Sequence, residues 1–452
     1  MIVRPPAGAG KPVPAGANNA VAMSLVFDLL YALALLIGWP YLVYRRWKRG
    51  PSGLPVRELL GRVPSRPVSA RCVWIHGVSL GEINATRTLV AELRRRSPDT
   101  VVVLSSTTAT GLAQARKLYP NLITFRFPLD FSFAIRALLA RIRPTLIVLM
   151  ELEVWPNLIE VATARSIPVV VVNGRITAER SVRRFKWPIV RWLARRMFSR
   201  LRWVGAQDAT YAARFVELGV PPERVTVTGS VKFDAAEIAD RIDGQEELAA
   251  AMGIDGARPL WVCGSTGPGE EALILDAYER LTAKFPDLQL AIVPRKPERF
   301  DEVAQLIVQR GYACLRRSTG APTLPAGVGE PRPVCLGDTM GELRKFYALA
   351  TVVFVGRTLV PMGGSDVMEV AALAKPVLVG PYTDNFAEAV ELLLAAGGGR
   401  RVASVDELVA LVGDLLRHPD VARQMGQAGR EAIQRRRGAT VTTVERLLEL
   451  MP

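Results

Sequence analysis

Short runs of apolar, β-branched residues recur along the chain and alternate with amphipathic stretches rich in Ala, Leu and Arg. Runs that are apolar throughout are typical of parallel strands buried on both faces, with helices covering the sheet. The first series of predicted strands comprises 72–76, 101–105, 123–127, 145–150, 168–173, 202–206 and 224–229. The second series comprises 259–264, 288–294, 312–316, 333–337, 351–356 and 376–380. This alternation predicts an α/β protein with two Rossmann-like lobes.

A stretch rich in charge, Ala and Gly separates the two series. We therefore expect an N-terminal domain over 71–234, a linker over 235–258, and a C-terminal domain over 259–452 that ends in a closing basic helix. A chain of 452 residues suits two domains of roughly 200 residues each. Since strand carboxyl ends face the ligand crevice in such sheets, the ligand is expected in the cleft between the lobes.

The segment 21–44 is apolar except for Asp28 and is long enough to span a bilayer core. Four basic residues follow at 45–49, and by the positive-inside rule this flank belongs in the cytoplasm. A cleaved signal peptide would carry its charges before the apolar run, so an uncleaved anchor helix is predicted. Asp28 and Pro40 leave open whether it spans the bilayer or lies in its interface.

The segments on either side of this anchor have no core-forming pattern. Residues 1–20 read as a disordered Pro/Gly/Ala tail, and translation is expected to begin at Met23. Residues 45–70 read as a basic juxtamembrane segment. The catalytic lobes would accordingly face the cytoplasm at the inner membrane.

The net charge of +15 favours an anionic partner. Nucleic acid is the weakest candidate partner because no nucleic-acid motif occurs and only 7% of residues are aromatic. An acidic membrane surface and a phosphorylated substrate are the candidates that remain. The four cysteines show no C-x-x-C spacing and sit in or beside strand runs, which indicates reduced, buried thiols. With no Asp-x-Asp and only two histidines, metal-independent chemistry is expected.

Three clusters in the first lobe carry candidate catalytic groups. In WIHGVSLGEINAT (74–86), Glu82 follows a predicted strand and begins a helix, whose dipole and free N–H groups favour the ionised carboxylate that a general base needs. On spacing alone, a simple first-turn glutamate is the more common alternative. In MELEVWPNL (150–158), either Glu151 or Glu153 can face the crevice. In TGSVKFD (228–234), Lys232 can meet a phosphate or a developing negative charge.

Four turns in the second lobe follow predicted strands: GSTGPGEE (264–271), VPRKPERF (293–300), GDTMGEL (337–343) and VPMGGSDVMEVAAL (360–373). Glycine-rich turns of this kind cradle anions with backbone N–H groups. Arg295 can bind phosphate in a bidentate manner, and Glu369 can accept hydrogen bonds from ribose hydroxyls. Together the turns predict a nucleotide site.

Taken in order, these clusters resemble the 3-deoxy-D-manno-octulosonic acid (Kdo) transferases of lipopolysaccharide synthesis. The resemblance rests on HGVSLGE, MELEVWPN, TGSVKFD, GSTGPGEE, VPRKPERF, GDTMGEL, GGSDVMEVAA and GPYTDNF, and covers nearly the whole chain from Met23. It implies a GT-B fold. It further implies an inverting, metal- and cofactor-independent transfer of Kdo from CMP-Kdo to the glucosamine disaccharide of a lipid A precursor (lipid IVA).

The resemblance also implies roles for single residues. Glu82 matches the proton acceptor, and Glu151 and Lys232 match the pair that stabilises the transition state. The segments that match CMP-contacting positions are Pro294, Arg295, Met340, Gly341, Glu342, Asp366, Val367, Met368 and Glu369. The number of Kdo residues transferred and the acyl-chain preference stay open.

Four positions depart from the family pattern. Gly267, Lys296 and Ser365 stand where the family commonly has histidine, and Asp366 stands where it commonly has asparagine. Loss of imidazoles changes the charge and pH response of the donor site. Two other hypotheses follow: a related GT-B enzyme that uses another nucleotide sugar, and a non-catalytic membrane scaffold on the same fold.

Overall fold

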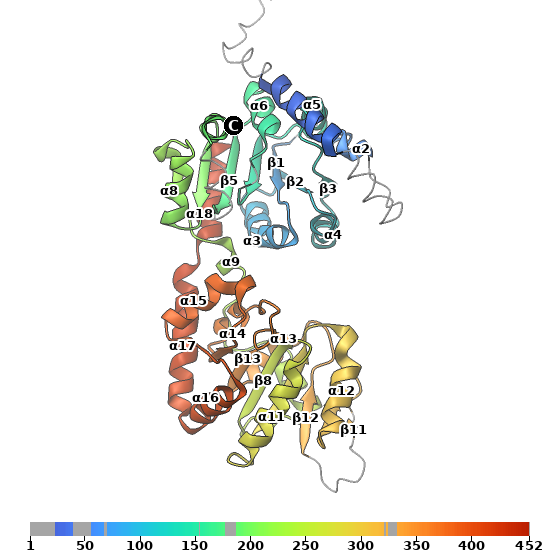
Figure 1. The fold of residues 1–452 in the computed structure, drawn as a ribbon, viewed down its shortest axis with the longest axis vertical. Helices are drawn as coiled ribbons and strands as arrows, with labels where there is room; N and C mark the ends of the chain where they lie inside the picture. Colours follow the sequence, from blue (N-terminus) through green and yellow to red (C-terminus); the bar gives the residue numbers. More distant parts are fainter. Residues whose placement is uncertain are drawn as a thin grey trace, which may run out of the picture. The chain divides into compact units, whose positions relative to one another are not determined.

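The computed structural model describes residues 23–38, 56–66, 70–152, 154–176, 187–320, 322–323 and 332–451. The chain divides into two compact units: Met1–Ala235 with Arg437–Pro452, and Ala236–Arg436 (Figure 1). Each unit contains one sheet covered by helices. The predicted tail 1–20 and most of the juxtamembrane segment lie outside the described residues.

The first unit has seven strands, and each predicted strand is present. They are β1 (Cys72–His76), β2 (Val101–Ser106), β3 (Ile123–Arg126), β4 (Leu146–Met150), β5 (Val169–Gly174), β6 (Trp203–Ala206) and β7 (Val225–Val227). Its helices are α2 (Val56–Leu59), α3 (Leu80–Arg96), α4 (Ala109–Leu118), α5 (Ser132–Ile142), α6 (Pro156–Ala164), α7 (Pro188–Phe198), α8 (Ala209–Glu217), η3 (Pro222–Arg224), α9 (Val231–Asp234) and α18 (Ala439–Leu450).

All strand pairs of this sheet are parallel, in the order β3-β2-β1-β4-β5-β6-β7. The order reverses direction between β1 and β4. In open α/β sheets, ligands bind outside the carboxyl ends of the strands at such a switch point. The turns after His76 and Met150 are therefore where a site is expected.

The apolar runs of the strands are buried on both faces, as their uninterrupted pattern predicts. Along β1, Cys72 and Trp74 belong to one core cluster, whereas Val73 and Ile75 belong to the cluster on the opposite face. The second cluster also contains Val444 and Leu447 of α18. The C-terminal helix thus covers the same face of this sheet as α3.

The second unit has eight strands: β8 (Leu260–Thr266), β9 (Gln289–Pro294), β10 (Ala313–Arg316), β11 (Pro322–Thr323), β12 (Pro333–Leu336), β13 (Val352–Val355), β14 (Val377–Val379) and β15 (Gly399–Arg401). Its helices are α10 (Gln245–Ala251), α11 (Glu270–Thr282), η4 (Pro297–Arg299), α12 (Phe300–Gln309), α13 (Leu343–Leu349), α14 (Met368–Ala372), η5 (Asp384–Phe386), α15 (Ala387–Ala395), α16 (Val405–Arg417) and α17 (Pro419–Arg436).

The strand order in this sheet is β11-β10-β12-β9-β8-β13-β14-β15. Every pair is parallel except β10 with the short edge strand β11. Here the order reverses between β8 and β13, so the turns after Thr266 and Val355 flank the switch point. The sequence missed only β11 and β15, two short edge strands.

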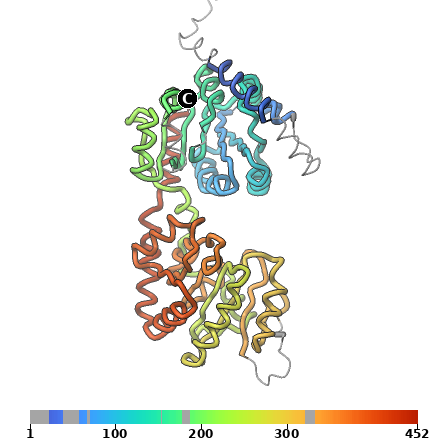
Figure 2. Tube along the Cα trace, viewed as in Figure 1, coloured from blue at the N-terminus to red at the C-terminus, as the bar shows by residue number. Residues whose placement is uncertain are grey.

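Two predicted boundaries were wrong. The expected linker 235–258 contains α10, which packs on α13 within the second unit. The expected closing helix is two helices, α17 and α18, separated at Gly438, whose φ of 109° few other residues adopt. α18 belongs to the first unit, where it packs on α3 and α9, as the red end of the trace in Figure 2 shows.

The predicted anchor segment 21–44 is only partly described. Residues 23–38 form a helix that lies over α5 and α6, drawn in blue in Figure 1. Asp28 accepts hydrogen bonds from Ser132 N (2.7 Å), Ser132 Oγ (2.6 Å) and Asn157 Nδ2 (2.9 Å). Within the described part of the chain, no helix combines the length and the apolar character needed to cross a membrane.

The prediction of reduced, buried thiols is confirmed. All four cysteines are free and buried: Cys72, Cys263, Cys314 and Cys335. Burial raises the pKa of the Cys72 thiol to about 11, so this group is an unreactive thiol at neutral pH.

Candidate functional site

Glu82 lies in the first turn of α3, directly after β1. The N-cap residue Ser79 accepts a hydrogen bond from Glu82 N, and the carboxylate of Glu82 reaches back to Ser79 Oγ and Val78 N, both at 2.8 Å. This arrangement differs from a standard capping box only in that Glu82 accepts from the N–H of Val78 and not from that of the N-cap residue Ser79. Glu82 therefore caps its own helix, and these bonds fix its half-buried carboxylate at the switch point of the first sheet.

The electrostatics of Glu82 differ from the sequence-based expectation. Burial raises the pKa of Glu82, and the nearby charge of Glu151 raises it further, while hydrogen bonds from Val78 and Ser79 lower it. The net shift is upward from 4.5. The sequence suggested that the helix terminus would favour the ionised carboxylate. Burial outweighs any such effect on the pKa of Glu82. A raised pKa makes the ionised carboxylate a stronger base.

Glu151 directly follows β4, on the other side of the same switch point. Its backbone has a left-handed φ of 56°, unusual for a residue with a Cβ. This conformation ends the strand and aims the side chain at Lys232, whose Nζ lies 3.7 Å from Glu151 Oε1. Glu153 lies outside the described residues, so of the two glutamates the structure places only Glu151, and its role stays a prediction.

Lys232 lies on the four-residue helix α9, which is held from two sides. Asn173 Oδ1, at the end of β5, accepts from Val231 N at 3.2 Å. Asp234 accepts from Gly438 N (2.6 Å) and Thr440 N at the start of α18. The returning C-terminal helix thus positions Lys232. Sequence reasoning missed Asn173 and Asp234, because both act through partners far away in the chain.

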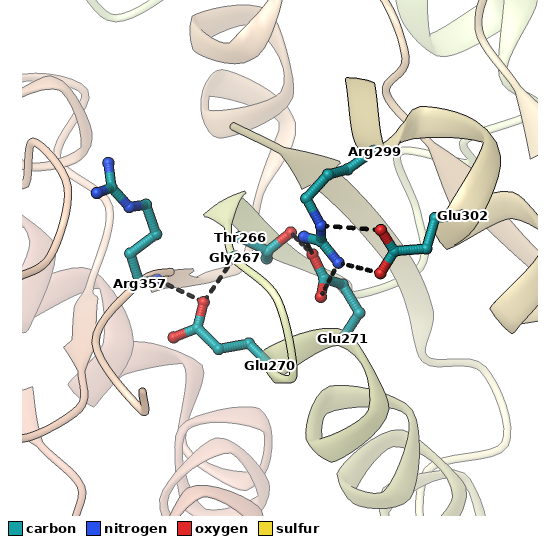
Figure 3. A network of polar contacts seen from close by, with 7 residues as sticks. All are labelled: Thr266, Gly267, Glu270, Glu271, Arg299, Glu302 and Arg357. Carbon is teal, nitrogen blue, oxygen red and sulfur yellow. Dashed lines mark hydrogen bonds and ion pairs between the residues drawn. The ribbon is translucent and has the colours of Figure 1, made fainter. Parts of the chain in front are cut away.

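The glycine-rich turn after β8 was expected to bind an anion through its backbone N–H groups. The anion found there is a carboxylate of the protein itself, that of Glu270. The buried carboxylate of Glu270 accepts from the backbone N–H groups of Gly267 (2.9 Å), Thr358 (2.7 Å), Leu359 (2.9 Å) and Arg357 (Figure 3). The Gly267 N–H group of this turn is therefore already bonded to the protein's own carboxylate, and binding of a ligand phosphate by the turn stays a prediction. Glu270 instead ties the β8 turn to the β13 turn.

A second buried carboxylate in this motif is also structural. Glu271 binds Arg299 through both of its oxygens and accepts from Thr266 Oγ1 at 2.8 Å, and Arg299 also binds Glu302 (Figure 3). This network connects α11 to η4 and α12. It fixes the exposed segment that carries Arg295, whose N–H donates to Thr266 O at 3.1 Å.

Asp366 and Glu369 lie together at the start of α14. Burial raises the pKa of both carboxyls; the charge of Arg295 opposes the shift at each, and Met368 N, at 2.8 Å, also opposes it at Asp366. Ser365 Oγ is buried nearby without a hydrogen-bond partner among the described residues. Buried polar groups of this kind call for a partner such as a bound ligand.

The remaining donor-site candidates follow β12. Met340 is exposed and Gly341 has a left-handed φ of 90°. Burial alone would raise the pKa of Glu342, but hydrogen bonds from Arg317, Thr339 and Lys345 lower it to about 2. Glu342 is therefore a fixed anion at the start of α13. Two further candidates, Val367 and Met368, follow Asp366 in the chain. Pro294 ends β9.

The predicted residues thus form two groups. Glu82, Glu151 and Lys232 gather in the first unit, and the CMP-site candidates line turns at strand carboxyl ends of the second unit. Among the described residues, no three His, Cys, Asp or Glu side chains gather in a metal-binding group. Arg357, which follows β13, was not singled out from the sequence, although a cation directly after a buried strand is a usable signal.

Comparison with known proteins places the chain in a family. The family model for 3-deoxy-D-manno-octulosonic-acid transferase (kdotransferase) matches residues 55–235. The chain is 34% identical to the 3-deoxy-D-manno-octulosonic acid transferase of Haemophilus influenzae over 84% of this chain and 86% of the relative. It is 35% identical to that of Bordetella pertussis over 92% of this chain and 98% of the relative.

A solved structure shares the fold of this chain. A glycosyltransferase from Rickettsia africae superposes with a TM-score of 0.54 at 12% identity, covering 84% of this chain and 99% of that structure. At this identity the likeness concerns the fold alone, and it confirms the predicted α/β, GT-B arrangement of two Rossmann-like units. By sequence and fold together, the chain belongs to the family of Kdo transferases.

Proposed function

We propose that this protein transfers Kdo from CMP-Kdo to a glucosamine hydroxyl of a lipid A precursor (lipid IVA), in an inverting and metal-independent displacement. The observation that carries the proposal is the arrangement at the switch point of the first unit. There the half-buried Glu82, whose pKa is raised, lies near the Glu151–Lys232 ion pair. A base with a neighbouring anion and cation is suited to a hydroxyl nucleophile and an anionic donor.

In the proposed reaction Glu82 accepts the proton of the acceptor hydroxyl. The hydroxyl oxygen forms a bond to the anomeric carbon of Kdo, on the face opposite the phosphate. The bond from that carbon to the phosphate oxygen breaks, and CMP leaves with the electron pair. Lys232 stabilises the negative charge that develops, and Glu151 holds Lys232 in position.

We assign donor binding to the second unit. Arg295 supplies an exposed cation next to Asp366 and Glu369, whose carboxyls can accept hydrogen bonds from the nucleoside. Met340, Gly341 and Glu342 supply a second turn, and Val367 and Met368 carry the backbone between the two carboxylates. The unpartnered hydroxyl of Ser365 would be satisfied by the ligand.

A mass-resolved product assay tests this function. It combines the purified protein, CMP-Kdo generated in situ and the tetra-acylated disaccharide bisphosphate. Addition of one or more Kdo masses to the acceptor is the expected result, and the number of additions gives the valency. Tight binding of a UDP-sugar with no response to CMP-Kdo would instead support a different donor, and no transfer with any donor would support a scaffold.

We also infer that the protein docks on the cytoplasmic leaflet of the inner membrane. Asp28 and Tyr31 hold one face of the 23–38 helix on the first unit, whereas Leu29, Leu36 and Ile37 on it are 71%, 72% and 72% exposed. Such a helix is suited to lie in the interfacial plane rather than to cross it. A bisphosphorylated lipid acceptor would be reached from there.

Helix α7 extends this apolar surface. Trp187 (73% exposed) and Ile189 (75%) project from its start, and exposed Arg191 and Arg195 are close in sequence. α7 and the 23–38 helix both contact α6. Aromatic and basic side chains beside an apolar face match the interface of an anionic leaflet.

Vesicle flotation tests this docking. A Leu29→Glu/Leu36→Glu variant and an Ile189→Glu variant should each lose binding to vesicles that contain phosphatidylglycerol. Val421→Glu changes an apolar residue of α17 that is also exposed, and serves as the matched control. Flotation that is equal for all three variants and the unmodified protein would contradict the proposed surface.

A further inference from the structure

Arg357 and Gly267 face each other across the switch point of the second sheet. Gly267 follows β8, and Arg357 follows the neighbouring strand β13 after Gly356. A Cβ at position 267 would lie 2.7 Å from Met362 Sδ and 3.1 Å from Arg357 Cγ. The stem of Arg357 and the sulfur of Met362 therefore fill the space that a side chain at 267 would need.

The backbone of Arg357 is held in an unfavourable conformation. Its φ is 63°, in the left-handed region that side chains with a Cβ rarely adopt. The conformation is fixed by two bonds: Arg357 N donates to Glu270, and Arg357 O accepts from Gly364 N at 2.8 Å. A strained residue that a glycine would replace without strain is a sign of a functional side chain.

The guanidinium of Arg357 has unused donors. Among the described residues, the guanidinium donates from Nη2 to Met362 O at 3.3 Å, and its Nε is buried without a partner. In Figure 3 the side chain points away from the Glu270 carboxylate, whereas Arg299 is paired with two carboxylates. An arginine has five N–H donors, so most of those of Arg357 are free for a ligand.

Backbone N–H groups of the turns after β8 and β13 are already bonded within the protein. Glu270 already accepts from the N–H groups of Gly267, Arg357, Thr358 and Leu359. An anion that approaches the switch point therefore meets the Arg357 side chain and not an open N–H cradle. The guanidinium fork is matched to two oxygens of a phosphate or a carboxylate.

We propose that Arg357 is the cation that binds the oxyanion of the activated sugar in this chain. Its side chain occupies the place next to Gly267 where the family commonly carries an imidazole, so a permanent charge replaces a titratable one. The proposal rests on the proposed function, because it takes CMP-Kdo as donor. CMP-Kdo offers two anionic groups, the phosphate and the Kdo carboxylate, and the experiment separates them.

The test uses the full chain with Arg357→Met and Arg357→Gly. The methionine variant removes the charge but keeps much of the stem, and the glycine variant suits the left-handed backbone, so at least one is expected to fold. Calorimetric titrations with cytidine and with CMP report on the phosphate. The KM for CMP-Kdo, at saturating acceptor, reports on the whole donor. Arg310→Met, which removes an arginine paired with Asp276 on the same unit, is the matched control.

If Arg357 binds the phosphate, both variants should weaken CMP about ten- to hundredfold and leave cytidine unchanged, because a charge-assisted pair is lost. If it binds the carboxylate, CMP binding stays constant and the KM for CMP-Kdo rises by a similar factor. Unchanged CMP binding and unchanged KM in folded variants would overturn the proposal while the transferase function stands. An unmodified protein that neither binds CMP nor transfers Kdo would overturn both.

Discussion

Lys232 Nζ lies 3.7 Å from Glu151 Oε1, in a pair whose side chains are 38% and 24% exposed. An ion pair this accessible contributes little to stability, on the order of 0–1 kcal/mol. Its two members come from distant parts of the chain, and each depends on a special backbone feature: the left-handed φ of Glu151 and the short helix α9. We therefore expect the pair to matter more for activity than for folding.

The first prediction concerns this pair. Lys232→Met and Glu151→Gln should each lower kcat by about 10²- to 10³-fold, with unfolding midpoints near that of the unmodified protein. Since the two act as a unit, the double variant should be about as slow as the slower single variant. Steady-state kinetics and urea denaturation measure both effects, with Arg280→Met, from the exposed Arg280–Asp406 pair, as control. Multiplicative losses in the double variant would show that the residues act independently.

The second prediction follows from the electrostatics of Glu82. A base must be deprotonated, so the transfer rate should rise with pH through the raised pKa of Glu82. Glu151→Gln removes a negative charge that raises this pKa, so the rising limb of the profile should move to lower pH in that variant. The pH dependence of kcat/KM measures it. A limb that stays in place or moves upward would refute the assignment of the limb to Glu82.

The third prediction concerns the attachment of the 23–38 helix. Burial raises the pKa of Asp130 to about 7, amide N–H groups of Asn157 and Leu158 oppose this, and the charge of Asp28 adds to it. Between about pH 4 and 7 the folded protein therefore holds a proton that the unfolded chain releases, and this group makes the free energy of unfolding fall as pH rises.

Asp28→Asn tests this linkage, because asparagine can keep the bonds to Ser132 and Asn157 while the charge is lost. The pKa of Asp130 should then fall, and the decrease in stability between pH 5 and 7 should be shallower than in the unmodified protein. Urea denaturation across this range is the measurement, and Asp420→Asn, at the exposed start of α17, is the control. A steeper or unchanged decrease would rule out the coupling.

The fourth prediction concerns Asp366. Asp366→Asn keeps the oxygen that accepts from Met368 N but removes a negative charge beside the proposed nucleotide site. The KM for CMP-Kdo should fall roughly threefold to tenfold at pH 8, as expected for loss of a like-charge interaction near a surface. Because burial raises the pKa of Asp366, the effect should disappear on acidification at a higher pH than an exposed aspartate would show. An unchanged KM would place the nucleotide elsewhere, and a KM that rises would show that hydrogen bonds to the Asp366 carboxylate outweigh its charge repulsion.

Much of the fold could be predicted from the sequence, because strands buried on both faces leave uninterrupted apolar runs. The strands β1 to β6, β8 to β10 and β12 to β14 carry this signal, whereas β7 reads Val-Thr-Val and is mostly exposed. β15 reads Gly-Arg-Arg and is exposed beyond its first residue, so its pairing with β14 leaves no pattern. The sequence also does not show to which unit α18 belongs. Val444 and Leu447 indicate an apolar helix face, but not which sheet that face covers.

The site was predictable by residue type but not by partner. Position after a strand identified Glu82, Glu151 and Lys232 as candidates, whereas their roles came from family resemblance. The turn with Glu270 had the form of an anion cradle, yet the glutamate that fills it stands in the same motif. Asp28 was the one charge of an apolar run, and only the structure shows that it caps α5. Such pairings depend on tertiary contacts that no local pattern encodes.

The most direct measurement is the single-turnover rate of Kdo transfer by Glu82→Gln at saturating CMP-Kdo and lipid acceptor. Glutamine can keep the cap with Val78 N and Ser79 Oγ but cannot accept the proton, so the rate should fall by at least about 10²- to 10⁴-fold while the melting temperature and CMP affinity are retained. Glu92→Gln, on the same helix and paired with Arg95 and Arg96, should transfer at the unmodified rate. A Glu82→Gln protein that transfers Kdo within tenfold of the unmodified enzyme would contradict the account.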